Sequence, residues 1–174
     1  ESIGCFAQDG SGITAETDLV VASAAIEDTV VEIQKAKQLN IPILKRSELL
    51  ALIAANKKTI AVAGTSGKST TSAMLFDILE YAGLQPSIIS GAGLVSLIKK
   101  GRIGNAKVGE GDWLVIEADE SDGYIVQYKT EIGLLLNIDK DHQEIDELLS
   151  LFGIFKKNSL SFSVNRAHSL TAGF

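Results

Sequence analysis

Hydrophobic positions in the first third of the chain alternate between a strand pattern and a helix pattern. Apolar runs at residues 18–26 and 41–44 predict two strands. Between them, residues 27–39 place apolar side chains at the three- and four-residue spacing of one helical face. A second helix is expected through residues 47–53, with Ser47 as its N-terminal cap. This β-α-β-α order predicts a parallel sheet.

The same alternation continues through the rest of the chain. The apolar run 59–62 predicts a strand, and an amphipathic helix follows it and stops at Gly83, a residue that suits a helix C-terminus. The glycine-rich region 91–111 predicts loops, with a hairpin around residues 99–101. Further strands are expected at residues 85–90, 112–118, 132–137 and 161–164, and a further helix at 144–157.

The connection between the strand 59–62 and its helix carries the clearest chemistry. Glycines allow a tight turn whose N–H groups point at an anion, and the helix N-terminus adds partial positive charge. Lys68 can reach terminal phosphates, and the Ser69 hydroxyl can bind Mg²⁺. We therefore predict a nucleoside triphosphate site formed by Gly64, Thr65, Ser66, Gly67, Lys68, Ser69 and Thr70.

This loop departs from the common phosphate-binding pattern. Val62 stands where the pattern G-x-x-x-x-G-K-[ST] has glycine, so the spacing here is the shorter Gly64-x-x-Gly67-Lys68. The alternative interpretation is an ordinary glycine turn between a strand and a helix. The preceding strand and the following amphipathic helix favour the phosphate-binding interpretation, because they are the context that the motif requires.

Polar residues also gather where two later strands end. Within the run 112–118, residues 114–117 have the form of a Walker B strand, which presents a carboxylate near Mg²⁺. Ligands of parallel α/β sheets bind at the carboxyl ends of strands, so these residues are expected near the loop if their strands are neighbours. A solvated acidic turn is the alternative for the first cluster. The two clusters contain Glu117, Asp119, Glu120 and Asp122, and Asn137, Asp139, Asp141 and His142.

Composition narrows the class of protein. The chain has 174 residues, 45% of them hydrophobic, so a packed core is expected in one domain or parts of two. Its net charge of −6 does not indicate a nucleic-acid surface, and Cys5, the single cysteine, cannot form an intrachain disulfide. We see no apolar run of transmembrane length and no signal peptide, and with ATP use this predicts the cytoplasm.

These patterns together predict an α/β protein in two parts. Residues 1–56 are expected to form a parallel-sheet, Rossmann-like N-terminal part. Residues 57–174 are expected to form an incomplete P-loop NTPase-type domain. Because the chain starts at Glu1 rather than Met and ends without a clear closing element, we expect a fragment of a longer protein.

Three motifs, taken in order, resemble the Mur ligase family: residues 64–70, 117–122 and 137–142. The likeness covers the chain from about Gly12 to Asn158. Within the family it is strongest to members that join L-alanine or a recycled tripeptide to UDP-N-acetylmuramate. The resemblance implies that residues 1–56 are the end of a UDP-sugar-binding domain and that residues 57–174 are part of a central ATP-binding domain.

The resemblance also implies a mechanism and its residues. Such ligases use ATP to phosphorylate a substrate carboxylate, and an incoming amine then displaces phosphate to form an amide. Lys68 would neutralise phosphate charge, Ser69 and Glu117 would hold Mg²⁺, His142 would bind a second metal or the phosphoryl acceptor, and Asn137 would orient groups at its strand end. The partners implied are UDP-N-acetylmuramate and an amino acid or short peptide, without nucleic acid or membrane.

Two other functions remain open at this point. A P-loop kinase or NTPase of other specificity could use the same loop, although Arg46, Arg102 and Arg166 form no obvious lid over the phosphates. A truncated fragment could also bind nucleotide without catalysing ligation.

Overall fold

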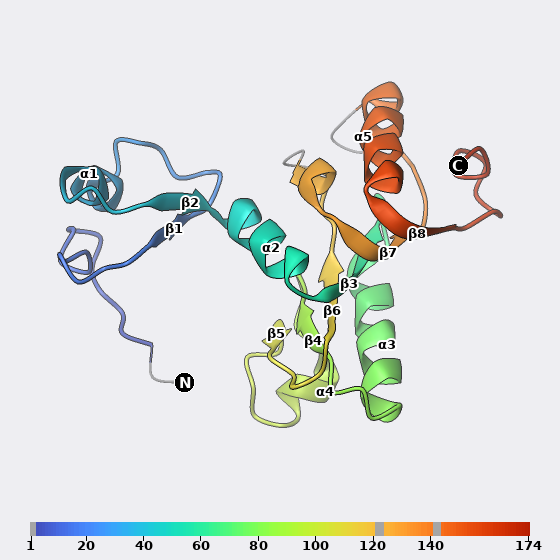
Figure 1. Cartoon of the computed structure of the whole chain (residues 1–174), viewed down its shortest axis with the longest axis horizontal. Coiled ribbons are helices and arrows are strands. Elements are labelled where there is room, and N and C mark those ends of the chain that lie inside the picture. The colour runs from blue at the N-terminus through green and yellow to red at the C-terminus, as the bar shows by residue number, and fades with distance from the viewer. Residues whose placement is uncertain (1–2, 121–123, 141–143) are drawn as a thin grey trace. The chain divides into compact units, whose positions relative to one another are not determined.

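The computed structural model describes residues 3–120, 124–140 and 144–174 (Figure 1). Contacts within the chain divide it into two compact units, residues 1–50 and 51–174. Helix α2 (Arg46–Ala55) begins in the first unit and ends in the second. The predicted α/β class with a mostly parallel sheet is confirmed. The assignment of the two units to particular ligase domains stays a prediction.

The first unit is a small β-α-β arrangement. Its two strands are parallel, with Val21 opposite Leu44. Ile33 and Ala36 form the buried face of the intervening helix, as the spacing of apolar residues predicted. The elements are β1 (Val20–Ala22), α1 (Val31–Gln38) and β2 (Ile43–Lys45).

The start of this unit's helix was predicted wrongly. The expected helix 27–39 begins only at Val31, because the preceding residues close two turns. The N–H of Ile26 donates to the Ser23 carbonyl at 3.0 Å, and the N–H of Val30 donates to the Glu27 carbonyl at 3.2 Å. Val30 itself is extended, with φ −64° and ψ 136°, so the helix cannot continue back through it.

The second unit contains a six-stranded sheet among the described residues (Figure 1). Its strands are β3 (Lys58–Ala63), β4 (Ser87–Ile89), β5 (Ala106–Lys107), β6 (Trp113–Glu117), β7 (Thr130–Leu135) and β8 (Ser159–Val164). Its remaining elements are α3 (Lys68–Tyr81), α4 (Val95–Ile98), α5 (Ile145–Lys157) and the 3₁₀ helix η1 (Tyr124–Gln127).

The order of strands in this sheet is β5-β4-β6-β3-β7-β8, and every neighbouring pair is parallel except β4 with β5. Strand β3 therefore lies between β6 and β7, with Ala61 opposite Ile116 on one side and Gly133 on the other. Because the carboxyl ends of parallel strands meet at one edge, the loop after β3 and the polar ends of β6 and β7 come together there.

The core of this unit explains why the sheet holds this order. Strand β3 is buried from Thr59 to Ala63, as expected of a central parallel strand. Helix α3 contacts β3, β4 and β6, and α5 contacts β7 and β8. One apolar cluster beneath α3 consists of Phe76, Ile88, Leu94, Leu97 and Val115.

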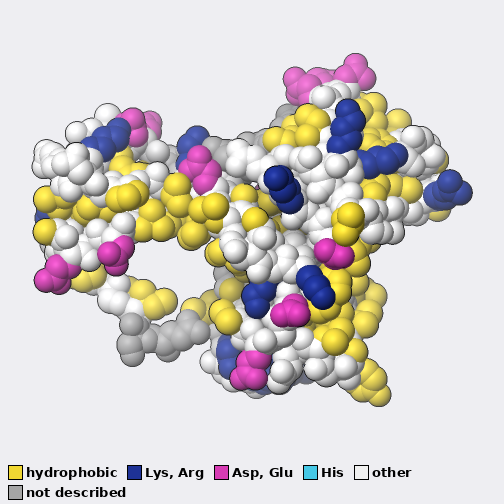
Figure 2. Space-filling model, in the orientation of Figure 1, with side chains coloured by type: hydrophobic (Ala, Val, Ile, Leu, Met, Phe, Trp, Pro, Cys, Tyr) yellow, Lys and Arg dark blue, Asp and Glu magenta, His cyan; other side chains and the backbone are white. Residues whose placement is uncertain are grey.

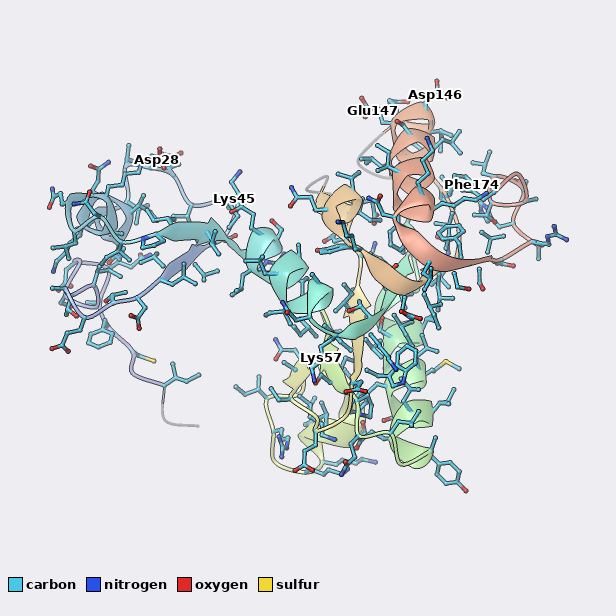
Figure 3. The ribbon with its side chains drawn as sticks, in the orientation of Figure 1. Asp28, Lys45, Lys57, Asp146, Glu147 and Phe174 are labelled. Carbon is cyan, nitrogen blue, oxygen red and sulfur yellow. The ribbon has the colours of Figure 1, made fainter. Side chains whose placement is uncertain are left out.

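Charged residues at the two ends of α5 favour its helical form. Asp146 and Glu147 lie in its first turn (Figure 3), and Lys156 and Lys157 lie in its last turn. This arrangement complements the helix dipole.

Hydrophobic side chains remain exposed along α3 (Figure 2). They include Met74, Ile78 and Tyr81. No helix among the described residues is both long enough and apolar enough to cross a membrane.

Two further local expectations were wrong. Residues 99–101 do not turn a hairpin; they follow α4 and end it, with Gly101 at φ 75° and its N–H donating to the Ile98 carbonyl. Ser47 does not cap α2, since the helix already starts at Arg46. Instead, the Glu48 carboxylate accepts from the N–H of Lys45 at 2.7 Å. The hydrogen bond at the start of α2 therefore comes from a side chain within the helix.

Candidate nucleotide-binding site

The loop between β3 and α3 depends on its two glycines. Gly64 has φ 135° and Gly67 has φ 81°, conformations that residues with a side chain rarely adopt. A Cβ atom on Gly64 would lie 3.2 Å from the backbone N and O of Asn137, so the loop also passes close to the end of β7. These constraints explain both glycines of the motif.

The loop also leads directly into a helix N-terminus. Gly67 is the N-cap of α3, and within the described residues no side-chain hydrogen bond caps this helix. The first N–H groups of a helix have no carbonyl partner inside the helix, so here they can bind an anion. Thr70 lies in this first turn and is exposed.

The Lys68 side chain lies back over the loop. Its Nζ donates to the Gly64 carbonyl at 2.7 Å and to the two carboxylate oxygens of Glu120 at 3.1 and 2.9 Å. The exposed fractions of the two side chains are 16% for Lys68 and 9% for Glu120. The ammonium group is therefore held at the mouth of the loop by a nearly buried carboxylate.

Glu117, at the end of β6, receives three hydrogen bonds. Ser69 donates from Oγ to Oε2 at 3.0 Å, the Ser90 hydroxyl donates to Oε1, and the N–H of Gly91 donates to Oε1 at 2.8 Å. These donors orient the carboxylate toward the start of α3. The structure thus brings Ser69 and Glu117 together, as their predicted role in one metal site requires.

The Ser69 and Glu117 oxygens fit a magnesium ion. Mg²⁺ prefers oxygen ligands in an octahedron at about 2.0–2.1 Å, and adjacent ligands of such an octahedron lie about 2.9 Å apart. The observed separation between Ser69 Oγ and Glu117 Oε2 is 3.0 Å. No group of three or more His, Cys, Asp or Glu side chains suited to a metal occurs among the described residues.

Asn137, on the other side of the loop, forms hydrogen bonds to the loop residues Thr65 and Ser66. Its Oδ1 accepts from Thr65 Oγ1 at 2.9 Å and from the N–H of Ser66 at 3.0 Å. Its Nδ2 donates to the Ser66 carbonyl at 3.0 Å. Thr65 Oγ1 also accepts from the N–H of Asp139 at 3.0 Å. These bonds fix the phosphate-binding loop to the end of β7.

The structure gives fewer contacts for the other predicted site residues, and some of them lie outside the described residues. Asp119 follows β6 and is partly buried. His142 and Asp122 lie outside the described residues, so the predicted role of His142 in metal or acceptor binding stays a prediction. His168, which the sequence did not mark as functional, places Nε2 3.3 Å from Asp139 Oδ1.

Sequence reasoning missed two residues of this site, Ser90 and Gly91. Both follow β4, a strand whose end was predicted but whose neighbour in the sheet was not. A polar residue directly after an apolar strand was the available signal, the same signal that identified Glu117 and Asn137. It was not sufficient, because a contact with Glu117 requires β4 to lie beside β6.

Comparison with known proteins finds many similar sequences. No protein-family model matches the chain. A UDP-N-acetylmuramate–L-alanine ligase of Mesorhizobium japonicum is 34% identical over 162 residues, which are 91% of this chain and 34% of that protein. The same ligase of a Nostoc species is 44% identical over 142 residues, or 79% of this chain and 28% of that protein. The chain spans about a third of the length of these relatives.

Two solved structures of ligases that act on UDP-N-acetylmuramate are also similar to the chain. The UDP-N-acetylmuramate–alanine ligase of Thermotoga maritima superimposes with a TM-score of 0.80 and 27% identity, covering 91% of this chain and 37% of that one. A UDP-N-acetylmuramate:L-alanyl-γ-D-glutamyl-meso-diaminopimelate ligase of Neisseria meningitides has a TM-score of 0.75, covering 91% of this chain and 55% of that one. At 22% identity, the second likeness shows a shared fold.

The strand order and the glycine loop define an α/β protein of the P-loop type. Its sequence and structural similarities are to ligases that act on UDP-N-acetylmuramate. The chain belongs to the Mur ligase family, and the resemblance inferred from its three motifs is confirmed.

Proposed function

We propose that the protein is an ATP-dependent ligase that joins the carboxylate of UDP-N-acetylmuramate to an amine, either L-alanine or a short peptide, in peptidoglycan synthesis or recycling. One observation carries this proposal. Lys68, Ser69 and Glu117 converge at the phosphate-binding loop of a chain that is 34–44% identical to UDP-N-acetylmuramate–L-alanine ligases.

The loop would bind the phosphates of ATP. Residues 64–70 supply backbone N–H groups and the N-terminus of α3, both suited to anions. Lys68 would neutralise the charge of the terminal phosphates. Asn137 would keep the loop in its binding conformation through its bonds to Thr65 and Ser66.

The reaction needs phosphoryl transfer because a carboxylate is a poor acceptor of an amine: its leaving group would be oxide. An oxygen of the substrate carboxylate attacks the terminal phosphorus of ATP, the bond between that phosphorus and ADP breaks, and an acyl phosphate forms. The amine nitrogen then attacks the acyl carbon, the carbon–oxygen bond to phosphate breaks, and the nitrogen loses a proton. The products are an amide, ADP and phosphate. The protein's task is mainly positioning and charge neutralisation.

Ser69 and Glu117 would hold a Mg²⁺ ion, which supplies charge neutralisation for the phosphate oxygens. Ser90 and Gly91 would support it indirectly, since their hydrogen bonds orient the Glu117 carboxylate. His142 is proposed, from the family resemblance, to bind a second metal or the phosphoryl acceptor.

We propose that the two units bind different ligands. We assign residues 57–174 to the ATP-binding domain and residues 1–56 to part of the domain that binds the UDP-sugar. A cavity of about 360 Å³ in the first unit, lined in part by Val20, Ser23 and Ile33, supports a ligand-binding role for that unit. Because ATP is the proposed energy source, we place the reaction in the cytoplasm.

Phosphate release by the full-length protein tests this proposal. ATP and Mg²⁺ are supplied with UDP-N-acetylmuramate and either L-alanine or the recycling tripeptide. We expect release only when both the UDP-sugar and one amine are present, and the effective amine identifies the branch of the family. Release from ATP alone, unaffected by either acceptor, would instead support a P-loop NTPase of other specificity. Nucleotide binding without release would leave a nucleotide-binding protein that is not a ligase.

A further inference from the structure

The ion pair between Lys68 and Glu120 leaves the loop lysine fully engaged. A lysine ammonium group has three N–H donors. In this structure its three acceptors are the Gly64 carbonyl at 2.7 Å and the two Glu120 oxygens at 3.1 and 2.9 Å. If Lys68 is to bind a phosphate oxygen, at least one of these three bonds has to be exchanged, and two of the three are to Glu120.

Burial makes this exchange energetically important. The Glu120 side chain is 9% exposed and the Lys68 side chain 16%, so water screens their attraction only weakly. Glu117 adds a second carboxylate to the same side of the loop, because it hydrogen-bonds Ser69, the neighbour of Lys68. An incoming phosphate therefore meets one lysine and two carboxylates.

We propose that Glu120 is a placeholder anion. Its carboxylate occupies the Lys68 ammonium until the phosphates of a magnesium–nucleotide complex replace it, and in this way it makes the loop prefer that complex over the metal-free nucleotide. This inference rests on the proposed function, since it concerns the same nucleotide site.

The preference follows from charge. A metal-free triphosphate is highly negative, and the repulsion from Glu117 and Glu120 opposes its approach. In the magnesium complex the ion offsets much of the phosphate charge and turns Glu117 from a repelling group into a ligand. Metal-free nucleotide is therefore opposed by both carboxylates, and removing the charge of Glu120 relieves a larger repulsion for this form than for the magnesium complex. A purely structural ion pair would instead affect both forms of the nucleotide equally.

Removing the charge of Glu120 tests the proposal. Affinity of the full-length protein for a non-hydrolysable ATP analogue is measured by calorimetry, once in excess MgCl₂ and once in EDTA. For Glu120→Gln we expect affinity for the metal-free analogue to rise about tenfold, and affinity for the magnesium complex to change less than about threefold. Glu120→Ala removes the same charge without adding an amide and is expected to give the same selective increase.

Two control variants test whether the change in affinity depends on the carboxylate of Glu120 itself, rather than on side-chain packing or on the net charge of the protein. Glu120→Asp keeps the carboxylate, so the preference for the magnesium complex should stay close to the wild-type value. Glu110→Gln removes an exposed carboxylate from the segment before β6, at the opposite end of the strand from Glu117, and should leave both affinities unchanged. Urea unfolding of each variant identifies any that fails to fold, and the remaining charge-removing variant then decides the test.

The outcomes distinguish this inference from the function on which it rests. If wild-type protein binds the magnesium complex, and Glu120→Gln and Glu120→Ala leave the ratio of the two affinities unchanged, the placeholder role is wrong while the nucleotide site stands. If wild-type protein binds neither form, the proposed function itself fails. A selective gain for the metal-free analogue in both charge-removing variants supports the inference.

Discussion

The two sides of the phosphate-binding loop use different chemistry. On the β6 side, carboxylates bind loop side chains: Glu117 accepts from the Ser69 hydroxyl, and Glu120 pairs with the Lys68 ammonium group. On the β7 side, the Asn137 amide forms neutral hydrogen bonds. Its partners are the Thr65 hydroxyl and the backbone N–H and carbonyl of Ser66. The two sides come from strands that are equivalent neighbours of β3 in the sheet.

This difference separates the task of binding ligands from the task of holding the loop. Hydrogen bonds to a carboxylate or an ammonium can be exchanged for bonds to Mg²⁺ or phosphate, because these ligands carry compensating charge. An amide bonded to backbone groups has no such exchange partner. We therefore expect changes on the β6 side to alter ligand dependence, and changes on the β7 side to alter the stability of the loop.

The largest effect is expected from Lys68→Ala, which removes the cation at the mouth of the loop. Loss of this charge should lower phosphate release by about a thousandfold, the upper range for removing one transition-state donor. Steady-state phosphate release with saturating substrates measures it. Lys57→Ala is a suitable control, because Lys57 (Figure 3) donates to the Gly111 carbonyl at the other end of β3. Near-normal ligation by Lys68→Ala would contradict the assignment of this site.

Glu117→Gln should produce the next largest effect, and this effect should be on the Mg²⁺ requirement of the reaction. Glutamine still accepts hydrogen bonds from Ser90 and Gly91 but has no charge for Mg²⁺. We expect the Mg²⁺ concentration for half-maximal phosphate release to rise about tenfold to a hundredfold, with a smaller change in nucleotide affinity. An unchanged Mg²⁺ titration would show that Glu117 is not the metal ligand.

Asn137→Ala tests the other side. The variant loses the bonds to Thr65 Oγ1 and to the N–H and carbonyl of Ser66, so the free energy of unfolding should fall by about 2 kcal/mol. Urea unfolding followed through the fluorescence of Trp113 in β6 measures this. The Mg²⁺ titration should keep its wild-type midpoint. A shifted midpoint without loss of stability would reverse the roles of the two sides.

The smallest expected effects come from a matched pair of hydroxyl deletions. Ser90→Ala removes one of the three hydrogen bonds to Glu117, a loss at the lower end of a single bond's net contribution, and should raise the Mg²⁺ requirement about threefold. Thr65→Val removes the bridge from Asn137 to Asp139 and should lower the free energy of unfolding by about 1 kcal/mol. Each variant is measured in both assays. Equal behaviour of the pair would mean that the two sides do not differ as proposed.

The sequence predicted most elements of the second unit, but it missed α4 and β5, which lie in the region 91–111 that was expected to form loops. The expected helix 144–157 matches α5, which begins at Ile145 and ends at Lys157, because its apolar face repeats regularly over several turns. The expected helix stop at Gly83 is also present: Gly83 has φ 75°, and the N–H of Leu84 donates to the Leu79 carbonyl at 3.0 Å. Prediction was poorer in the first unit, where turns at Ser23 and Glu27 use residues whose composition also suits a helix.

The sequence also predicted Lys68, Ser69, Glu117 and Asn137 as members of one site, since each lies directly after an apolar strand or within the glycine loop. It did not predict their partners. Glu120 was one of several acids without a distinct role, and Ser90 was only the end of a strand. Their importance depends on contacts that no short pattern encodes.

By itself, the sequence determined the loop and most of the strands and helices around it, because local periodicity and glycine chemistry act over a few neighbouring residues. It indicated the family through the resemblance of three ordered motifs, at residues 64–70, 117–122 and 137–142. Only the tertiary structure decided that β3 lies between β6 and β7 and that β4 lies beside β6. That order pairs Ser90 with Glu117 across 27 positions, Lys68 with Glu120 across 52, and Thr65 with Asn137 across 72. Strand order depends on how the buried faces of the whole sheet and its helices pack, and this packing assigns each polar strand end its partner.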